Sequence, residues 1–280
     1  MMRCGRNLGA AEPGGDRPLR VVSSFPPGTS RVRTKESFLN SPLVMKMEQY
    51  RRFSDEDRRL LNDLTSKRQR QYAAREDIVR EGDHSPDIHI VLSGLACRYK
   101  HLENGNRQIM AFLVPGDPCD AEIFILKTMD HSIGTLAPSV VASVSGDVMR
   151  DLMLNRPGTA LAFWWNTLQD EGILRERIID EGRRDAYARI AFLIYEVLLR
   201  MRAVGVIEDQ AFDFPITQLD LADATGLTLG HVNRVLQRLR EEGLIATEGQ
   251  RWRVLDAAGL RQAAHFESSY LHLDRAVDEP

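Results

Sequence analysis

Apolar and polar residues alternate in two different ways along this chain, and the change from one to the other divides it. Between about residues 70 and 150 the apolar residues fall in short runs rich in branched side chains, such as 87–92 and 107–114. Asn104-Gly105 lies between two such runs and is a strong hairpin signal, because both residues tolerate a positive φ. Short, closely spaced strands predict an antiparallel β-sandwich or barrel.

After Arg156-Pro157-Gly158 the apolar residues repeat every three to four positions, which predicts helices. The first runs from Thr159 to about Glu181 and the second from Arg184 to about Val204. The apolar residues of the first helix could be buried inside the subunit or form a dimer seam, since the stripe does not hold one strict heptad. These residues are Leu161, Trp164, Trp165, Leu168, Ile173, Leu174, Ile178 and Ile179.

Two segments precede the strands. Residues 1–40 are rich in Gly, Pro, Ser and Arg, and they carry too few apolar residues to offset the entropy of ordering, so we predict a disordered leader. Ser54 then caps a short helix whose acidic residues at 55–57 suit the positive end of the helix dipole.

The pattern after residue 216 predicts a helix-turn-helix. Thr217 can cap a first helix, Gly226 permits a tight turn, and Thr228 can cap a second helix that Gly243 ends. Four apolar residues of the second helix, spaced at i, i+3, i+4 and i+7, predict one buried stripe. They are Val232, Val235, Leu236 and Leu239.

The opposite face of this second helix carries side chains suited to a DNA groove. Arginine can donate two hydrogen bonds to guanine and Asn or Gln can pair with adenine, each contact contributing about 1–3 kcal/mol of discrimination. The runs 244–247 and 251–255 flank Glu248-Gly249-Gln250, which predicts a hairpin wing. The residues predicted to contact DNA are Thr217, Thr228, His231, Asn233, Arg234, Gln237, Arg238 and Arg251.

Composition changes this picture little. A chain of 280 residues with 43% hydrophobic and 28% charged residues predicts two folded units. The net charge of -3 does not exclude DNA, because phosphate attraction is local, and residues 228–253 hold five arginines against three acids. The sequence has no membrane-spanning stretch and no motif of an enzyme active site, so we expect a cytoplasmic protein that is not an enzyme.

The three cysteines, Cys4, Cys97 and Cys119, are scattered, which predicts neither a disulfide framework nor a metal site and fits a reducing cytoplasm.

At these residues the chain resembles the Crp/Fnr family of bacterial transcription regulators, over about residues 50–258. The resemblance is carried by the segments 78–83, 92–94 and 112–117 and, most specifically, by His231-Val232-Asn233-Arg234 within the helix-turn-helix. It implies an α+β fold: an antiparallel β-roll of the cyclic-nucleotide-binding type at 41–158, a dimerisation helix at 159–183, a winged helix-turn-helix at 184–258 and a tail at 259–280.

The resemblance further implies a homodimer on a palindromic site in double-stranded DNA, with RNA polymerase as a further partner. Arg234 matches the family's base-contacting arginine. Leu229 and Gly230 depart from the family, in which a base-reading Glu is common, and glycine has no side chain with which to contact cytosine. We therefore expect a half-site that differs from the usual family consensus.

The sensor segment 118–135 does not resemble a cyclic-nucleotide site. Asp130-His131 stands where the family's phosphate-binding arginine is expected, and Asp120 adds a second acid, so a phosphodiester would meet acids without a paired arginine. Only Cys4 lies near the N-terminus, where the oxygen-sensing branch has an iron–sulfur cysteine cluster. We expect no resident cofactor. The candidate effector residues are Cys119, Asp120, Met129, His131 and Ser132.

Two alternatives for the sensor stay open. Haem could be held by His131, Met129 or Cys119, and Cys119 could be a thiol switch. The alternative function is a cyclic-nucleotide- or haem-responsive module that acts through protein contacts.

Overall fold

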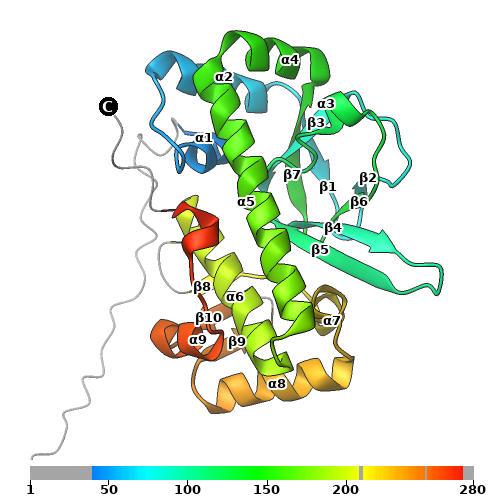
Figure 1. Cartoon of the computed structure of the whole chain (residues 1–280), viewed down its shortest axis with the longest axis vertical. Coiled ribbons are helices and arrows are strands. Elements are labelled where there is room, and N and C mark those ends of the chain that lie inside the picture. Colours follow the sequence, from blue (N-terminus) through cyan, green and yellow to red (C-terminus); the bar gives the residue numbers. More distant parts are fainter. Residues whose placement is uncertain (1–39, 208–210, 250, 274–280) are drawn as a thin grey trace, which may run out of the picture.

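The computed structural model describes residues 40–207, 211–249 and 251–273. Its N-terminal half is a β-roll of two antiparallel sheets (Figure 1). One sheet has the order β1 (Gln69–Tyr72), β7 (Ser139–Ser145), β3 (Asp87–Ser93), and the other β2 (Asp77–Val79), β6 (Ser132–Thr135), β4 (Ala96–His101), β5 (Arg107–Leu113). The predicted hairpin joins β4 to β5, and its Gly105 has a φ of 82°. The antiparallel β fold is confirmed.

Short helices surround the β-roll: α1 (Pro42–Met47), α2 (Asp55–Ser66), α3 (Ile123–Leu126) and α4 (Gly146–Asn155). The Ser54 hydroxyl accepts the Asp57 N–H at the start of α2, as the sequence predicts. The short helix α1, capped by Ser41, was not predicted. Apart from its last residue, the predicted disordered leader lies outside the described residues.

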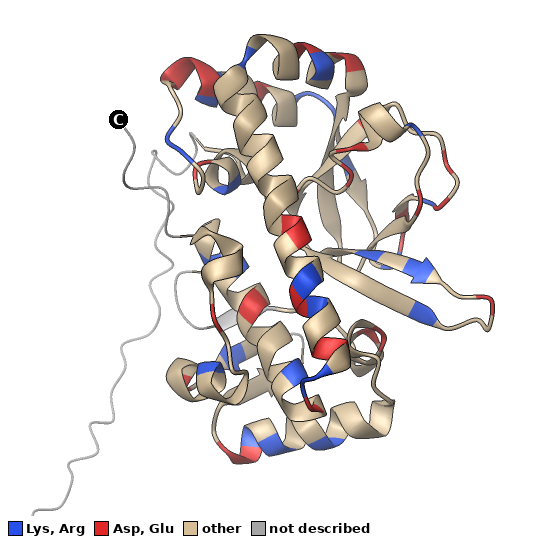
Figure 2. Ribbon diagram, viewed as in Figure 1, with Lys and Arg blue, Asp and Glu red and all other residues tan. Residues whose placement is uncertain are grey.

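The long helix α5 (Pro157–Gly182) has two apolar faces. It starts two residues before the predicted position, because proline is well suited to the first turn of a helix. Trp165 and Ile173 are buried, whereas six of the predicted apolar residues are between 43% and 73% exposed. These six are Leu161, Trp164, Leu168, Leu174, Ile178 and Ile179. The first half of α5 carries no charged residue (Figure 2).

The C-terminal half is a winged helix formed by α6 (Ala186–Ala203), β8 (Ala211–Asp213), α7 (Gln218–Thr225), α8 (Leu229–Glu241), β9 (Ile245–Glu248), β10 (Arg251–Val254), α9 (Ala257–Ala263) and the 3₁₀-helix η2 (Ser269–Leu271). The predicted wing is the β9–β10 hairpin. Strand β8, which sequence reasoning missed, pairs with the other edge of β10.

The segment predicted as a C-terminal tail is folded as far as residue 273, which corrects that prediction. Leu260, Ala264, Phe266 and Leu271 are buried in the same core as α6. The apolar spacing of these residues gives α9 and η2 a face to pack against α6 and α5. Residues 274–280 lie outside the described part of the chain.

One continuous apolar core joins the β-roll to the winged helix. Phe112 of β5 packs edge to face on Phe214, and Phe214 packs in the same way on Trp252 of the wing, with ring centroids 5.6 Å apart in both pairs. The domain boundary predicted at residue 184 therefore does not divide the core, and the β-roll and the winged helix pack as one body.

Buried charges cross the same interface. Asp117, in the turn after β5, lies 3.0 Å from Lys46 Nζ of α1 and 2.6 Å from Arg200 Nη2 of α6. Glu196 of α6 lies 3.0 Å from Arg177 Nη2 of α5. Lys46, Asp117, Glu196 and Arg200 are at most 3% exposed. Although burial opposes ionisation, Lys46 and Arg200 hold the pKa of Asp117 below its usual range.

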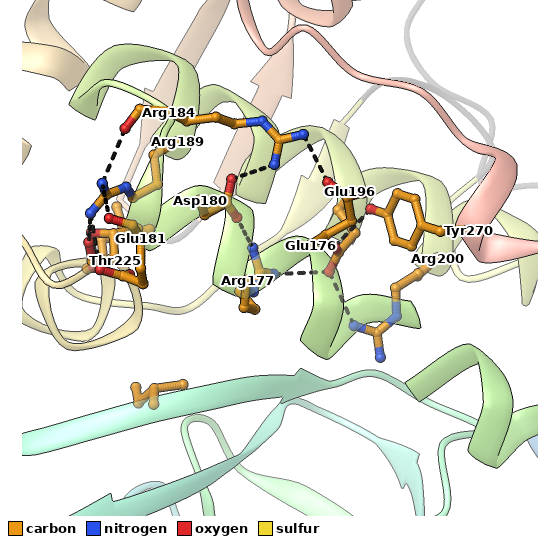
Figure 3. A network of polar contacts seen from close by, with 12 residues as sticks. Glu176, Arg177, Asp180, Glu181, Arg184, Arg189, Glu196, Arg200, Thr225 and Tyr270 are labelled. Carbon is orange, nitrogen blue, oxygen red and sulfur yellow. Dashed lines mark hydrogen bonds and ion pairs between the residues drawn. The ribbon is translucent and has the colours of Figure 1, made fainter. Parts of the chain in front are cut away.

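This buried charge network continues along α5. Asp180 accepts hydrogen bonds from Arg177 at 3.0 Å and from Arg184 at 2.7 Å, and Arg184 also donates to Glu176 at 2.8 Å. Tyr270 of η2 donates its hydroxyl to Glu196 at 2.8 Å. Because a buried charge must stay paired, these contacts hold α5, α6 and the C-terminal segment together (Figure 3), and Arg200 joins them to Asp117 of the β-roll.

We predict that Arg200→Met lowers the free energy of unfolding by about 3–5 kcal/mol, because it removes one partner from Asp117 and one from Glu196 while both acids stay buried. Urea unfolding followed by circular dichroism measures this. Arg150→Met is the matched control, since Arg150 is exposed and its ion pair among the described residues is with Asp147. Equal stability of the two variants would contradict the role given to the network.

Candidate DNA interface and effector site

The helix-turn-helix is built by the local signals that the sequence contains. Thr217 and Asp220 form a capping box at the start of α7, and the Thr228 hydroxyl accepts the His231 N–H at the start of α8. Gly226 takes a φ of 62° in the turn, and a Cβ there would lie 2.6 Å from a Glu181 carboxylate oxygen. The positive φ therefore favours glycine in this turn, whereas the close contact is with the end of a flexible side chain that can move aside.

Helix α8 has a buried apolar face and an exposed polar face. Val232, Val235, Leu236 and Leu239 are buried, as predicted. His231, Asn233, Arg234, Gln237 and Arg238 are all exposed.

Among the exposed residues of α8, the freest side chains are Asn233 and Arg234. Gln237 donates to Glu241 at 2.9 Å, and Arg238 donates to Glu242 at 2.8 Å and lies over the Tyr187 ring of α6, so both side chains have partners within the subunit. Neither Asn233 nor Arg234 has a side-chain hydrogen bond or ion pair to another described residue. Their donors and acceptors are thus available to base edges, which is the property that direct readout needs.

The wing is joined to α8. Arg240 donates to the Thr247 hydroxyl of β9 at 3.1 Å. Arg251 and Arg253 are exposed on β10, with Trp252 between them buried, so both arginines lie on the outer face of the wing. This face can supply phosphate contacts beside the groove that α8 would enter.

The β-roll holds the N-terminal end of α7. Asp220 is fully buried and accepts two hydrogen bonds from Arg75, at 2.5 and 2.7 Å, and one from Arg107 at 2.6 Å, while Arg107 also donates to Asp223 at 2.7 Å. Burial alone would raise the pKa of Asp220, but the bonds from Arg75, Thr217 and Arg107 outweigh it and lower that pKa.

Helix α5 and helix α6 hold the other end of α7. Arg189 donates to the Thr225 carbonyl at 2.6 Å and to Glu181 at 3.1 Å (Figure 3). The helix that supports α8 is therefore fixed at both ends. Sequence reasoning missed these contacts, because the partners of Asp220 lie 113 and 145 residues away and no local pattern points to them.

Thr217 does not lie on the α8 face. It lines a cleft of about 670 Å³ between the β-roll and α7, together with Tyr99, His101, Arg107 and Asp220. Its hydroxyl is bonded to Asp220. A second cleft of about 410 Å³ lies beside α3 and α4 and includes Phe124 and Arg150.

The predicted effector residues are buried inside the β-roll, but they line neither of these two clefts. They are Cys119, Asp120, Met129, His131 and Ser132. Asp120 is paired with His89 of β3, with Nδ1 2.8 Å from Oδ2, and His131 Nδ1 lies 2.6 Å from Asp130 Oδ1. Burial raises the pKa of the Cys119 thiol well above its usual range. A protonated thiol is a poor nucleophile, so this environment does not favour a thiol switch.

An arginine from another strand lies beside the sensor segment, although it forms no ion pair with Asp120 or Asp130. Arg98 of β4 donates to the Cys119 carbonyl at 2.9 Å and to Asp170 of α5 at 2.9 Å. Arg98 lies outside the segment 118–135, so a comparison of that segment with the family pattern could not identify it. Because Asp170 already takes its charge, Arg98 is not free to bind a phosphate.

Within the described ranges, no group of three or more His, Cys, Asp or Glu side chains could hold a metal ion. Cys4 lies outside those ranges, and Cys97 and Cys119 are both buried free cysteines. No described helix is long and apolar enough to cross a membrane.

Comparison with known proteins matches both halves of the chain. Residues 69–156 match the cyclic nucleotide-binding domain family and residues 188–263 the Crp-like helix-turn-helix domain family. The chain is 27% identical to the transcriptional activator protein FnrL of Cereibacter sphaeroides, covering 65% of this chain and 74% of that protein. It is 25% identical to the nitrogen fixation regulation protein FixK of Azorhizobium caulinodans, covering 68% and 77%.

A solved structure, that of FixK2 from Bradyrhizobium japonicum, shares the fold with a TM-score of 0.62. It is 23% identical and covers 70% of this chain and 96% of that one.

We predict that Asp220→Asn destabilises the protein most near neutral pH. A carboxyl whose folded pKa is lowered contributes stability above its unfolded pKa, near 3.9, and loses that contribution as pH falls towards the folded value. The difference in unfolding free energy between wild type and variant should therefore stay constant from about pH 7 to about pH 5 and shrink from about pH 5 to about pH 3. Urea titrations across this range measure it. A difference that stays constant over the whole range would mean that Asp220 is not held as an ion.

Proposed function

Because this chain belongs to the Crp/Fnr family of transcription regulators, we propose that it binds a palindromic DNA site as a homodimer, with the free face of α8 in the major groove. The observation that carries the proposal is the pair Asn233 and Arg234, exposed and without an intramolecular partner on the described chain. The relatives are regulators of transcription, which does not favour the alternative of a module acting through protein contacts.

The exposed apolar face of α5 supports the homodimer. Exposed large apolar residues that form one stripe mark an interaction surface, and Trp164 and Ile178 are 63% and 73% exposed. A two-fold axis along α5 would place two α8 helices on the same side of the dimer, as reading two half-sites about 34–36 Å apart requires. The regulator would act in the cytoplasm, with RNA polymerase as its further partner.

The exposed residues of α8 and the wing differ in the part of the DNA that each would contact. Arg234 donates to guanine and Asn233 pairs with adenine, while His231 adds a contact at the start of α8. Gly230 offers no side chain, so the half-site lacks a carboxylate contact to cytosine at that position. Arg238 and Arg251 contact phosphates, and Gln237 contacts a base once it leaves Glu241.

We further propose that the sensor does not bind a cyclic nucleotide. Three features support this: His131 is paired with Asp130, Asp120 is paired with His89, and Arg98 is neutralised by Asp170. A phosphodiester entering this region would have to break a buried ion pair to gain an arginine, which is costly.

The DNA proposal predicts that replacing both Asn233 and Arg234 with alanine weakens binding to the selected site at least about a hundredfold, since two base contacts of about 1–3 kcal/mol each are lost. Selection from random duplexes supplies the site, and fluorescence anisotropy measures the affinity. The loss should be similar at low and high salt, because base contacts release no counterions.

The matched control is Arg251→Ala, which should weaken binding to all sequences to a similar extent. Because one phosphate contact is lost, the slope of log affinity against log salt concentration should become shallower by about one. If the double alanine variant kept its affinity and sequence preference, α8 would not be the reading helix.

The sensor proposal predicts that cyclic AMP and cyclic GMP leave the DNA affinity unchanged, because neither nucleotide finds a free arginine. Titration calorimetry on the dimer, with the DNA duplex as a positive control for active protein, measures binding directly. Heat of binding together with tighter DNA affinity would contradict this proposal and leave the role of α8 intact.

A further inference from the structure

The exposed stripe of α5 follows a heptad spacing that continues through two charged residues. Positions 161, 164, 168, 171, 175, 178 and 182 are separated alternately by three and four residues, which places them on one face of the helix. The residues at 161, 164, 168 and 178 are apolar and between 44% and 73% exposed. The residues at 171 and 175 are Glu171 and Arg175.

Within one subunit, this pair is an ordinary surface contact. Arg175 Nη1 lies 3.3 Å from Glu171 Oε2 one helical turn away, and the two side chains are 59% and 60% exposed. Leu174 and Ile179, which are 44% and 43% exposed, lie beside the pair. A dimer that buries the apolar stripe must therefore bury Glu171 and Arg175 as well, so the water that now solvates this pair has to be replaced by further charged or polar groups in the seam.

Two-fold symmetry supplies those partners. In a parallel helix pair each residue meets its own copy, which would place Glu171 against a second Glu and Arg175 against a second Arg. The two layers are about 6 Å apart along the axis, within reach of an arginine side chain. We propose, on the basis of the homodimer proposed above, that each Arg175 pairs with the partner subunit's Glu171, so that four charges form one neutral layer across the axis.

The charged layer fixes the register of the dimer. A slip of one heptad would set Glu171 against Trp164 or Ile178, leaving each Glu171–Arg175 pair buried among apolar side chains without the charges of the partner subunit. A polar layer at an otherwise apolar seam specifies alignment in this way, at a cost in stability. The alignment matters here because it determines the separation of the two α8 helices.

Charge reversal tests the layer. Glu171→Arg gives a homodimer with four positive charges in the layer, and Arg175→Glu gives one with four negative charges. Each variant alone should raise the dimer dissociation constant at least about tenfold, measured by sedimentation equilibrium. An equimolar mixture of the two variants restores two charges of each sign, so it should form heterodimers with an affinity close to that of wild type.

Two further proteins complete the experiment. The swapped variant carrying both Glu171→Arg and Arg175→Glu should dimerise like wild type. Arg150→Glu, an exposed reversal on α4 away from the stripe, is the matched control and should change nothing.

The outcomes separate this inference from the proposed function. If the single variants dimerised like wild type, or if their mixture gained no affinity, the proposed charged layer would be wrong. The proposed DNA-binding dimer would not be affected by that result. A wild-type protein that stays monomeric on its selected DNA site would overturn the proposed homodimer, and the layer with it. Heterodimer rescue cannot come from a misfolded variant, so it also controls for folding.

Discussion

The buried ion pair between Asp117 and Arg200 is the contact on which the arrangement of the two halves depends. It joins the turn after β5 to α6, and Lys46 on one side and Glu196 on the other extend it into a network that includes α1, α5 and η2. Because charges removed from water are stable only when paired in a fixed geometry, α6 cannot slide over the β-roll without exposing or unpairing them. Apolar packing of Phe112 on Phe214 closes the same interface.

Helix α7 is held by contacts at both of its ends, and these contacts fix the helix-turn-helix relative to the β-roll. Asp220 is bonded to arginines of the β-roll at one end of α7, and Arg189 bonds the Thr225 carbonyl at the other. Helix α8 packs its apolar stripe against this fixed support and leaves Asn233 and Arg234 without partners on the described chain. Function therefore follows from the difference between the two faces of α8: one is buried against the protein, and the other is exposed and carries the two side chains without partners.

The parts of this structure that the sequence predicted depend on local signals. The caps at Thr217 and Thr228, the turn at Gly226 and the hairpin at Gly105 act within a few residues, so they can be read from the order of residues alone. Strand β8, the position of Arg98 beside Cys119 and the bonds between Arg107 and Asp220 join segments far apart in the chain. Only the assembled fold brings such residues together, so neither the effector region nor the supports of α7 could be predicted.

The central claim is that the free face of α8 enters the major groove while its support keeps the contacts described above. A crystal structure of the dimer on its selected DNA duplex tests this most directly. We expect Arg234 and Asn233 within hydrogen-bond distance of base edges, with Arg189 still bonded to the Thr225 carbonyl. A complex in which α8 faces solvent and another surface contacts the duplex would contradict it.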